Sequence, residues 1–295
     1  MSTFLNAYEC LKQVRLALHV YDVDTTQGVQ DDLYFNNDYL MQKINNAQRY
    51  VYNRIFNLAP ERFLAIETAT FSGSSYTLPW DFARLSELRD ENGRKIHRAM
   101  GKTSARVASS GNEGYYYQQG NTLVLDKSGL SKNCTLIYYT KPRDMDQGRI
   151  GTTSAGSITL GKSAKKIADY YNGMLIENDS DSSDYVDTIT DYTADRVATI
   201  TATTTSEEED VYGIVSELPE PVHFLIPIKA VIDIKLEHPL SKIPIGRTEQ
   251  KAFDELLEDT LLVFGKPSSD ITISEILDDF GDYNNTGYAT ITTGD

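Results

Sequence analysis

The sequence predicts an α+β fold in which two pairs of amphipathic helices, one near each end of the chain, flank β-rich insertions. Three observations lead to this expectation. Apolar residues recur at helical spacing near both ends, they alternate with polar residues across the middle, and the last thirty residues carry isolated apolar residues between turn residues. Because such helices must bury their apolar stripes, we expect a four-helix core, interrupted by the insertions and followed by an extended C-terminal tail.

The N-terminal helical pair of this core is expected within residues 1–61. Residues 2–20 begin with Ser and Thr, which can cap a helix, and then carry apolar residues every three or four positions. After a polar loop, a second helix is expected to start at Asn37 or Asp38, and Pro60 follows its last turn.

Residues 62–142 are expected to form a β-rich subdomain, because their pattern changes to alternation and they are rich in β-branched and aromatic residues. The expected elements, in chain order, are an alternating segment with a Ser/Gly turn at 72–75, a loop and strand within 78–90, an Asn-Gly turn within 91–96, and strands at 121–127 and 133–140 joined by a turn that contains glycine.

Residues 143–217 are expected to form an inserted, smaller β-module. Its expected elements are a linker at 143–156, a strand at 157–160, a short helical segment at 164–170, a strand at 174–178, and strands at 185–192 and 196–201. A charged connector at 206–221 is expected to lead out of the module.

The C-terminal helical pair is expected within residues 218–265. One helix is predicted from Phe224 to near Pro239, and another runs from about Ile245 to Phe264, after which Gly265 and Pro267 favour a stop. The remaining residues, 266–295, are expected to be an extended tail with a short helix at 274–280.

The acidic stretch ENDSDSSDYVD, residues 177–187, has acidic residues at nearly alternate positions, as calcium-binding loops do. It lacks the Gly and the bidentate Glu that such a loop needs. The segments on both sides alternate as strands do, and Asp and Ser supply local hydrogen bonds in turns. We therefore interpret residues 179–184 as an acidic hairpin tip and assign no metal site.

The sequence offers no pattern of a catalytic or cofactor-binding centre. There is no nucleophile elbow, no P-loop, no dinucleotide-binding glycine motif and no metal-binding helix motif. The histidines are isolated from one another: His19, His97, His223 and His238. No apolar run approaches the ~20 residues that span a bilayer, no signal peptide is evident, and two distant cysteines argue against a disulfide framework.

The net charge of −15 argues against sequence-specific DNA binding, because such a surface repels phosphate, although DNA can still pass nearby. Two basic runs, at 94–106 and 162–166, could contact phosphate, but we favour solvated surface for both. The 19 tyrosines suit half-buried strands and protein interfaces.

Several segments resemble tailed-bacteriophage virion proteins. In AKKIADYYNGMLIENDSDSSDYVDTITDYTADRVATI, the stretches ADYYNGMLI, TITDY and RVATI resemble a small β-module that recurs in such proteins, with SDSSDY in place of its usual glycine-rich tip. YLMQKINNAQRYVYNRI, SYTLPWDFARLSELRD and the strands that end in CTLIYYTKPRD resemble segments of head-to-tail adaptor, or connector, proteins of short-tailed phages. The resemblance extends over residues 1–265 in the order of elements.

This resemblance implies a non-enzymatic structural protein of the virion neck, assembled in the host cytoplasm. It implies a homo-oligomeric ring, usually of twelve subunits, between the portal protein and the tail nozzle protein, with tail fibres as a further partner. Double-stranded DNA would pass through the ring without sequence-specific binding. It also suggests that the C-terminal tail reaches the portal, through Ile271, Ile273, Ile276, Leu277, Phe280 and Tyr283.

Two alternatives remain open from the sequence. One is a tail fibre or spike attachment protein, in which the β-module is the outward anchor. The other is a virion glycosidase, because a chain with so many carboxylates contains potential catalytic pairs.

Overall fold

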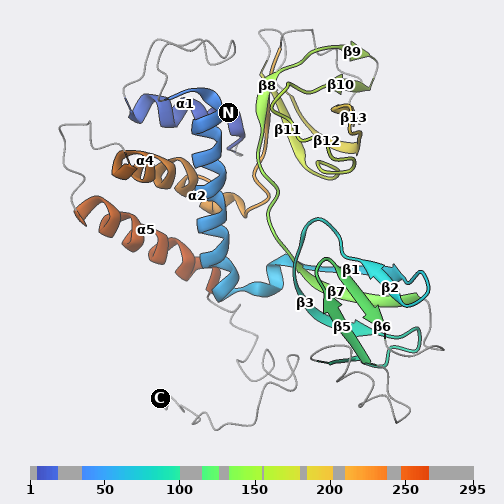
Figure 1. Cartoon of the computed structure of the whole chain (residues 1–295). Coiled ribbons are helices and arrows are strands. Elements are labelled where there is room, and N and C mark those ends of the chain that lie inside the picture. Colours follow the sequence, from blue (N-terminus) through green and yellow to red (C-terminus); the bar gives the residue numbers. More distant parts are fainter. Residues whose placement is uncertain are drawn as a thin grey trace, which may run out of the picture.

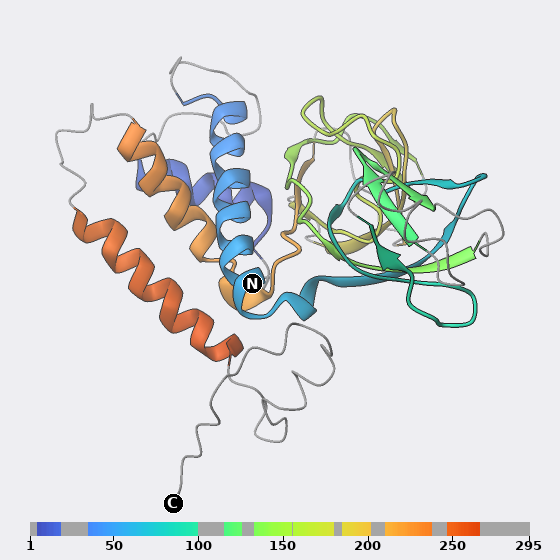
Figure 2. The ribbon, with the colours of Figure 1, turned by 60° about the horizontal axis from the view of Figure 1, so that its bottom comes forward.

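The computed structural model describes the chain in eight ranges: 5–18, 35–99, 115–125, 133–154, 156–179, 185–201, 210–237 and 247–265. Within these ranges there are four α-helices and three β-sheets, so the α+β class is confirmed. Helices from both ends of the chain lie together on one side, and the sheets lie on the other (Figures 1 and 2).

The helices are α1 (Ala7–Ala17), α2 (Asn37–Leu58), α4 (Leu225–Glu237) and α5 (Arg247–Gly265). The cap of α1 is Asn6 and not Ser2 or Thr3, because its side chain accepts a hydrogen bond from the Glu9 amide at 2.9 Å. The buried side chains of all four helices belong to one hydrophobic cluster, which includes Leu11, Ile44, Ala230 and Leu257.

The β-rich region contains two sheets that share a second hydrophobic cluster. The strands of the first, in spatial order, are β1 (Leu64–Thr70), β7 (Asn133–Thr140) and β3 (Phe82–Arg89). Those of the second are β2 (Ser75–Thr77), β6 (Thr122–Leu125), β5 (Tyr115–Gln119) and β4 (His97–Arg98). The turns expected at 72–75 and 91–96 are present, and Gly73 and Gly93 adopt the positive φ that each requires.

One expectation for this region needs correction. The strands expected at 121–127 and 133–140 exist as β6 and β7, but they lie in different sheets. β6 instead forms a hairpin with β5, which the sequence did not predict as a strand, and the turn between them passes through Gly120 at φ 58°. The residues between β6 and β7 lie outside the described ranges.

The third sheet has seven strands and curls on itself (Figure 1). Its strands, in spatial order, are β8 (Gln147–Arg149), β14 (Val211–Ile214), β11 (Leu175–Asp179), β12 (Tyr185–Tyr192), β13 (Val197–Ile200), β10 (Ser157–Thr159) and β9 (Thr153–Ser154). The edge strands β8 and β9 follow each other in the chain. The amide of Ile150 donates to Asp210 and that of Gly151 donates to Thr159, each at 2.8 Å, so this short segment joins the two edges of the sheet.

Three expectations for the module are wrong. The linker expected at 143–156 contains β8 and β9, and the connector expected at 206–221 contains β14. The short helix expected at 164–170 is a series of turns, because Asp169 adopts φ 62° and the chain there turns Tyr170 and Tyr171 into the interior. Tyr171, Tyr192 and Tyr212 fill the inside of the curl, and the first two rings lie 4.8 Å apart edge to face.

The hairpin predicted around the acidic stretch is consistent with the antiparallel pairing of β11 and β12, which extends from Leu175 opposite Thr188 to Asn178 opposite Tyr185. Residues 180–184 lie outside the described ranges. Among the residues the structure describes, no group of three or more His, Cys, Asp or Glu is placed to hold a metal ion. None of the helices described has the length and hydropathy of a membrane span.

Candidate functional site

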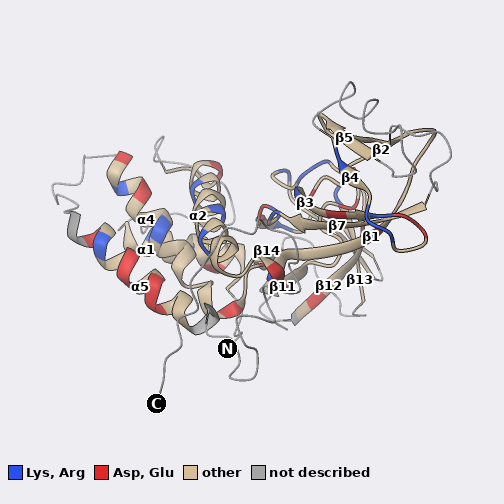
Figure 3. Cartoon of the chain, turned by 90° about the horizontal axis from the view of Figure 1, so that it is seen from below, with Lys and Arg blue, Asp and Glu red and all other residues tan. Residues whose placement is uncertain are grey.

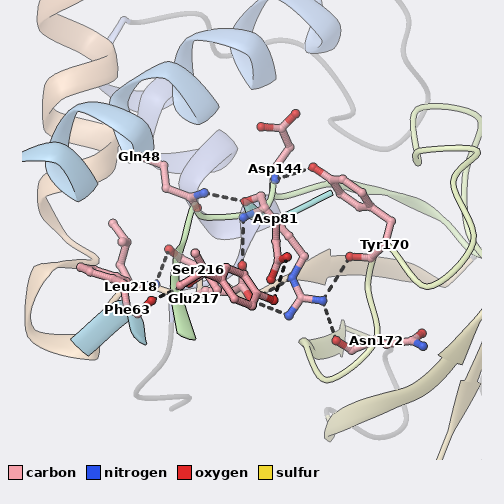
Figure 4. A network of polar contacts seen from close by, with 12 residues as sticks. Gln48, Phe63, Asp81, Asp144, Tyr170, Asn172, Ser216, Glu217 and Leu218 are labelled. Atoms are coloured by element: carbon pink, nitrogen blue, oxygen red, sulfur yellow. Dashed lines mark hydrogen bonds and ion pairs between the residues drawn. The ribbon is translucent and has the colours of Figure 1, made fainter. Parts of the chain in front are cut away.

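A dense network of polar contacts lies around Arg143, in the extended segment between β7 and β8. The Arg143 Nε donates to Glu217 Oε1 at 2.8 Å, and the Arg143 backbone amide donates to Glu217 Oε2 at 2.9 Å. The Nη1 atom donates to the carbonyl oxygens of Tyr170, at 3.1 Å, and Asn172, at 2.5 Å. Figure 4 shows Glu217, Tyr170 and Asn172 converging on this point. One planar guanidinium therefore links the segment before β8 to the segment after β14, and both of them to the turn at residues 170–172.

The same residue also contacts the helices and the β-rich region. The Arg143 carbonyl accepts a hydrogen bond from Gln48 Nε2, on α2, at 2.7 Å. Its guanidinium lies over the ring of Trp80, 5.4 Å from the centroid. The Trp80 and Tyr170 rings contact each other with centroids 4.8 Å apart and planes tilted by 35°. Burial raises the pKa of Asp81, and the hydrogen bond from Tyr138 and the charge of Arg143 oppose that shift. Arg143 thus contacts all three parts of the fold.

The residues that follow Arg143 hold the segment against α2. Asn45 and Met145 exchange two hydrogen bonds, from Asn45 Nδ2 to the Met145 carbonyl at 3.0 Å and from the Met145 amide to Asn45 Oδ1 at 2.8 Å. Asp144 forms ion pairs with Arg49 of α2 and, at 3.1 Å, with Lys165 of the module. The segment is therefore held against α2 by hydrogen bonds to its backbone as well as by ion pairs.

Asp146 is a buried carboxylate directly before β8, with 6% of its surface exposed. The Tyr212 hydroxyl donates to Asp146 Oδ2 at 2.5 Å and accepts a hydrogen bond from the Gly161 amide at 3.0 Å. Burial raises the pKa of Asp146 to about 6, although the hydrogen bonds oppose the shift. The carboxyl group therefore changes its protonation state close to neutral pH.

A cleft of about 1120 Å³ lies between α2 and the seven-stranded sheet, beside these residues. Its described lining includes cations and carboxylates in mixed order and neither His nor Cys. The Ser163 hydroxyl in it donates to the Gln147 carbonyl at 3.1 Å and also interacts with the Asp146 carboxylate. The charges that surround Arg143 and Asp144 pair with one another, an arrangement that suits a rigid joint between parts of the chain.

The residues singled out from the sequence are distributed differently. All six residues expected to contact the portal lie outside the described ranges: Ile271, Ile273, Ile276, Leu277, Phe280 and Tyr283. His19 and His238 also lie outside them, and His97 is exposed. His223 is buried, where its Nδ1 accepts from the Leu5 amide at 3.4 Å and its Nε2 donates to the Leu218 carbonyl at 2.6 Å. Burial lowers its pKa, which suits a neutral structural histidine.

The first basic run is exposed around β4, where the surface residues are Arg94, Lys95, His97 and Arg98. Figure 3 shows basic positions near β4 in blue. The rest of this run lies outside the described ranges. In the second run Lys162, Lys165 and Lys166 are exposed, and Lys165 is paired with Asp144.

Arg143 was not identified from the sequence, where it falls within the expected linker. Its partners Glu217 and Gln48 are 74 and 95 positions away, so no local spacing signals the contact. The one sequence feature near this site is Trp80, the single Trp of the chain, which lies in the segment that resembles an adaptor motif and contacts Arg143.

Comparison with known proteins gives one family. No curated protein matches the chain. A family model described as SU10 adaptor protein matches residues 8–157, half of the chain, from α1 to the start of β10. The match includes Gln48, Trp80 and Arg143 and ends inside the seven-stranded sheet.

Proposed function

Since the chain belongs to the SU10 adaptor family of phage head-to-tail adaptors, we propose that it forms a dodecameric ring between the portal and the tail nozzle of a short-tailed phage. The family match over residues 8–157 is the observation that supports this role most strongly. It covers α2, both sheets of the β-rich region and the Arg143 segment, so it includes the residues that connect the parts of the fold.

In this proposal the parts of the chain have distinct tasks. The helical pairs would form a four-helix core that makes the ring, the β-rich subdomain and the inserted module would give the platform for the tail, and the tail would reach the portal. The corresponding ranges are 1–61 and 218–265, 62–142, 143–217, and 266–295.

The ring would serve as a conduit that releases DNA. Four acidic side chains are exposed along α5: Glu249, Glu255, Glu258 and Asp259. Figure 3 shows the acidic positions of this helix in red. With a net charge of −15, most of the surface repels phosphate, and a channel wall of this kind does not retain the strand. This is consistent with passage of double-stranded DNA without sequence-specific binding.

The experiment that tests the role is electron microscopy of the purified protein mixed with portal protein. We expect rings docked on one end of the portal. Protein that stays monomeric and fails to bind the portal would contradict the proposal.

The placement of the portal contact is tested by deleting residues 266–295, which contain Ile276 and Phe280. The deletion should abolish portal binding, and circular dichroism should show that the helices remain folded. As a control, Ile66→Ser removes a β1 side chain that is 66% exposed and should leave binding intact. If binding survives the deletion, another part of the chain makes the contact.

A further inference from the structure

A groove of about 440 Å³ lies between α1, α4 and α5, and apolar side chains form most of its described lining. The residues that matter here are Ala17, Ile228, Val231, Ala252, Phe253 and Leu256. Ile228 on α4 and Leu256 on α5 are each 38% exposed, so the groove presents apolar surface from two helices.

The exposed apolar surface of α4 makes this groove a suitable site for an apolar segment. One side of α4 is buried through Leu225, Ile226 and Ala230, yet Ile228, on another side, is exposed within the groove. Apolar residues therefore lie on more than one side of α4, and Ile228 is left partly uncovered by the residues that the structure describes. An apolar segment laid between α4 and α5 would complete that burial.

We propose that residues 273–280 of the same chain occupy this groove as a short amphipathic helix. Ile273, Ile276, Leu277 and Phe280 stand at positions i, i+3, i+4 and i+7, which place them on one face of a helix. Glu275 and Asp278 then lie on the opposite face, toward solvent, and Asp279 lies at its edge. Anchors with this spacing are typical of a helix that binds a groove between other helices.

The length of chain after α5 fits this position. From Leu256 to Gly265, the α5 backbone rises about 14 Å. The seven residues 266–272 reach about 23 Å when extended, so residue 273 can return beside the groove. Connections of two to eight residues are usual between antiparallel helices. Pro267 follows the end of α5, and Thr272 supplies a capping residue directly before residue 273.

The charge of the groove rim agrees with an acidic segment. Lys235 lines the groove and lies 3.9 Å from Glu249, a long separation for an ion pair. Its ammonium group can therefore also pair with Asp279, at the edge of the docked segment.

This contact would act within one subunit. The docked segment would cover Ile276, Leu277 and Phe280, so any partner that binds these residues must first displace it from the groove. The inference concerns the isolated chain and stands whether or not the portal is that partner.

Disulfide cross-linking of the full-length chain tests the contact. Leu256→Cys is combined in turn with Ile276→Cys, Leu277→Cys and Phe280→Cys, and each protein is oxidised at low concentration. At least one pair should form an intrachain disulfide, seen as a monomer with altered mobility on a non-reducing gel. The matched control pairs Leu256→Cys with Glu275→Cys on the opposite face, and should react at least tenfold more slowly.

The native thiols should not interfere. Cys10 and Cys134 are buried, and burial raises the pKa of both, that of Cys134 to about 11. Disulfide-linked dimers would mean that a second copy fills the groove, and equal reaction of the Glu275→Cys control would mean that the tail is merely nearby. Either result would overturn the proposal.

Hydrogen exchange provides a test without engineered cysteines. Amides of residues 273–280 should be protected in the wild-type chain and should exchange at least tenfold faster in the Ile228→Glu, Leu256→Glu variant. Leu262→Glu is the matched control, because Leu262 is 63% exposed on α5 and is not part of the groove lining. Unprotected amides in the wild-type chain, or equal loss in the control, would overturn the proposal.

Discussion

At the scale of single residues, Arg143 illustrates why an arginine is required at a junction. Its guanidinium donates in the same plane to a carboxylate and to two backbone carbonyls while one face lies over Trp80. A lysine ammonium has the charge but not the planar set of donors. The side chain is only 14% exposed, so the groups it contacts would be left without water if it were removed.

We therefore predict that Arg143→Ala lowers the free energy of unfolding by about 2–4 kcal/mol, measured by urea denaturation. Arg143→Lys should lose part of that amount. Arg49→Ala is the control, because Arg49 is 49% exposed in its pair with Asp144 and such pairs contribute under about 1 kcal/mol. Equal losses for Arg143→Ala and Arg49→Ala would contradict the special role of Arg143.

The pKa of Asp146 leads to a prediction about pH. Because the folded state raises this pKa from 3.8 to about 6, the folded protein binds the proton more tightly than the unfolded chain. The stabilisation is complete below pH 3.8 and is lost as the pH rises through 6. Between pH 5 and pH 7.5 the protonated carboxyl should contribute about 1.4 kcal/mol to the free energy of unfolding.

In Asp146→Asn this contribution should vanish, because an amide does not titrate there but can still accept a hydrogen bond from Tyr212. The measurement is the difference in unfolding free energy between the two pH values in both proteins. His223, whose pKa is lowered by burial, acts in the opposite direction but is present in both and cancels. Identical pH dependence of the two proteins would refute the assignment.

At the scale of elements, the contact between α1 and β14 depends on the absence of a side chain at Gly213. A Cβ atom there would lie 2.7 Å from Asn6 Cγ and 3.0 Å from the Tyr8 amide nitrogen. Asn6 is the cap of α1, and its Nδ2 also donates to Glu177 of β11 at 2.5 Å. The helix cap and the sheet are thus joined through one residue.

Gly213→Ala should therefore displace the Asn6 side chain and destabilise the protein by about 2–3 kcal/mol, through the lost cap and the strain of overpacking. Thermal unfolding is the measurement. Gly151→Ala is the matched control, because its Cβ would meet nothing closer than 3.7 Å. The control should be neutral or stabilising by up to about 1 kcal/mol, and a comparable loss in both variants would rule out the clash.

The helices and longer strands could be predicted because their signals are local. The stripe of α2 and the alternation of β12 are both complete within the segment. In contrast, β8, β9 and β14 have two to four residues each, too few to show a period. β8 and β14 pair with each other from distant parts of the chain, and β9 pairs with β10, which follows it. The helix expected at 164–170 failed because burial of Tyr170 and Tyr171 outweighed local helix propensity.

Less of the candidate site than of the fold could be predicted from the sequence. The resemblance of the segment around Trp80 to an adaptor motif pointed to the family, which the family match confirmed. The roles of Arg143, Asp146 and Tyr212 could not be predicted, because they arise from contacts across the chain.

At the scale of the whole molecule, the net charge of −15 affects how copies associate. Identical acidic subunits repel one another, and salt screens this repulsion over about 10 Å at 0.1 M and about 3 Å at 1 M. If the proposed ring forms, assembly should increase by several-fold as sodium chloride rises from 0.05 M to about 0.5 M. Sedimentation velocity would measure this, and a decrease with salt would show instead that ion pairs between subunits dominate.

The pairing of Arg143 with Glu217 has an evolutionary consequence. These residues are 74 positions apart but hydrogen-bonded, and β8 and β14, which follow and precede them, pair side by side. The seven-stranded sheet is therefore a segment whose two ends meet. A segment of this kind can be exchanged, enlarged or lost during descent without altering the path of the remaining chain. We therefore expect relatives that share the helices to differ in the segment inserted between the residues that correspond to Arg143 and Glu217.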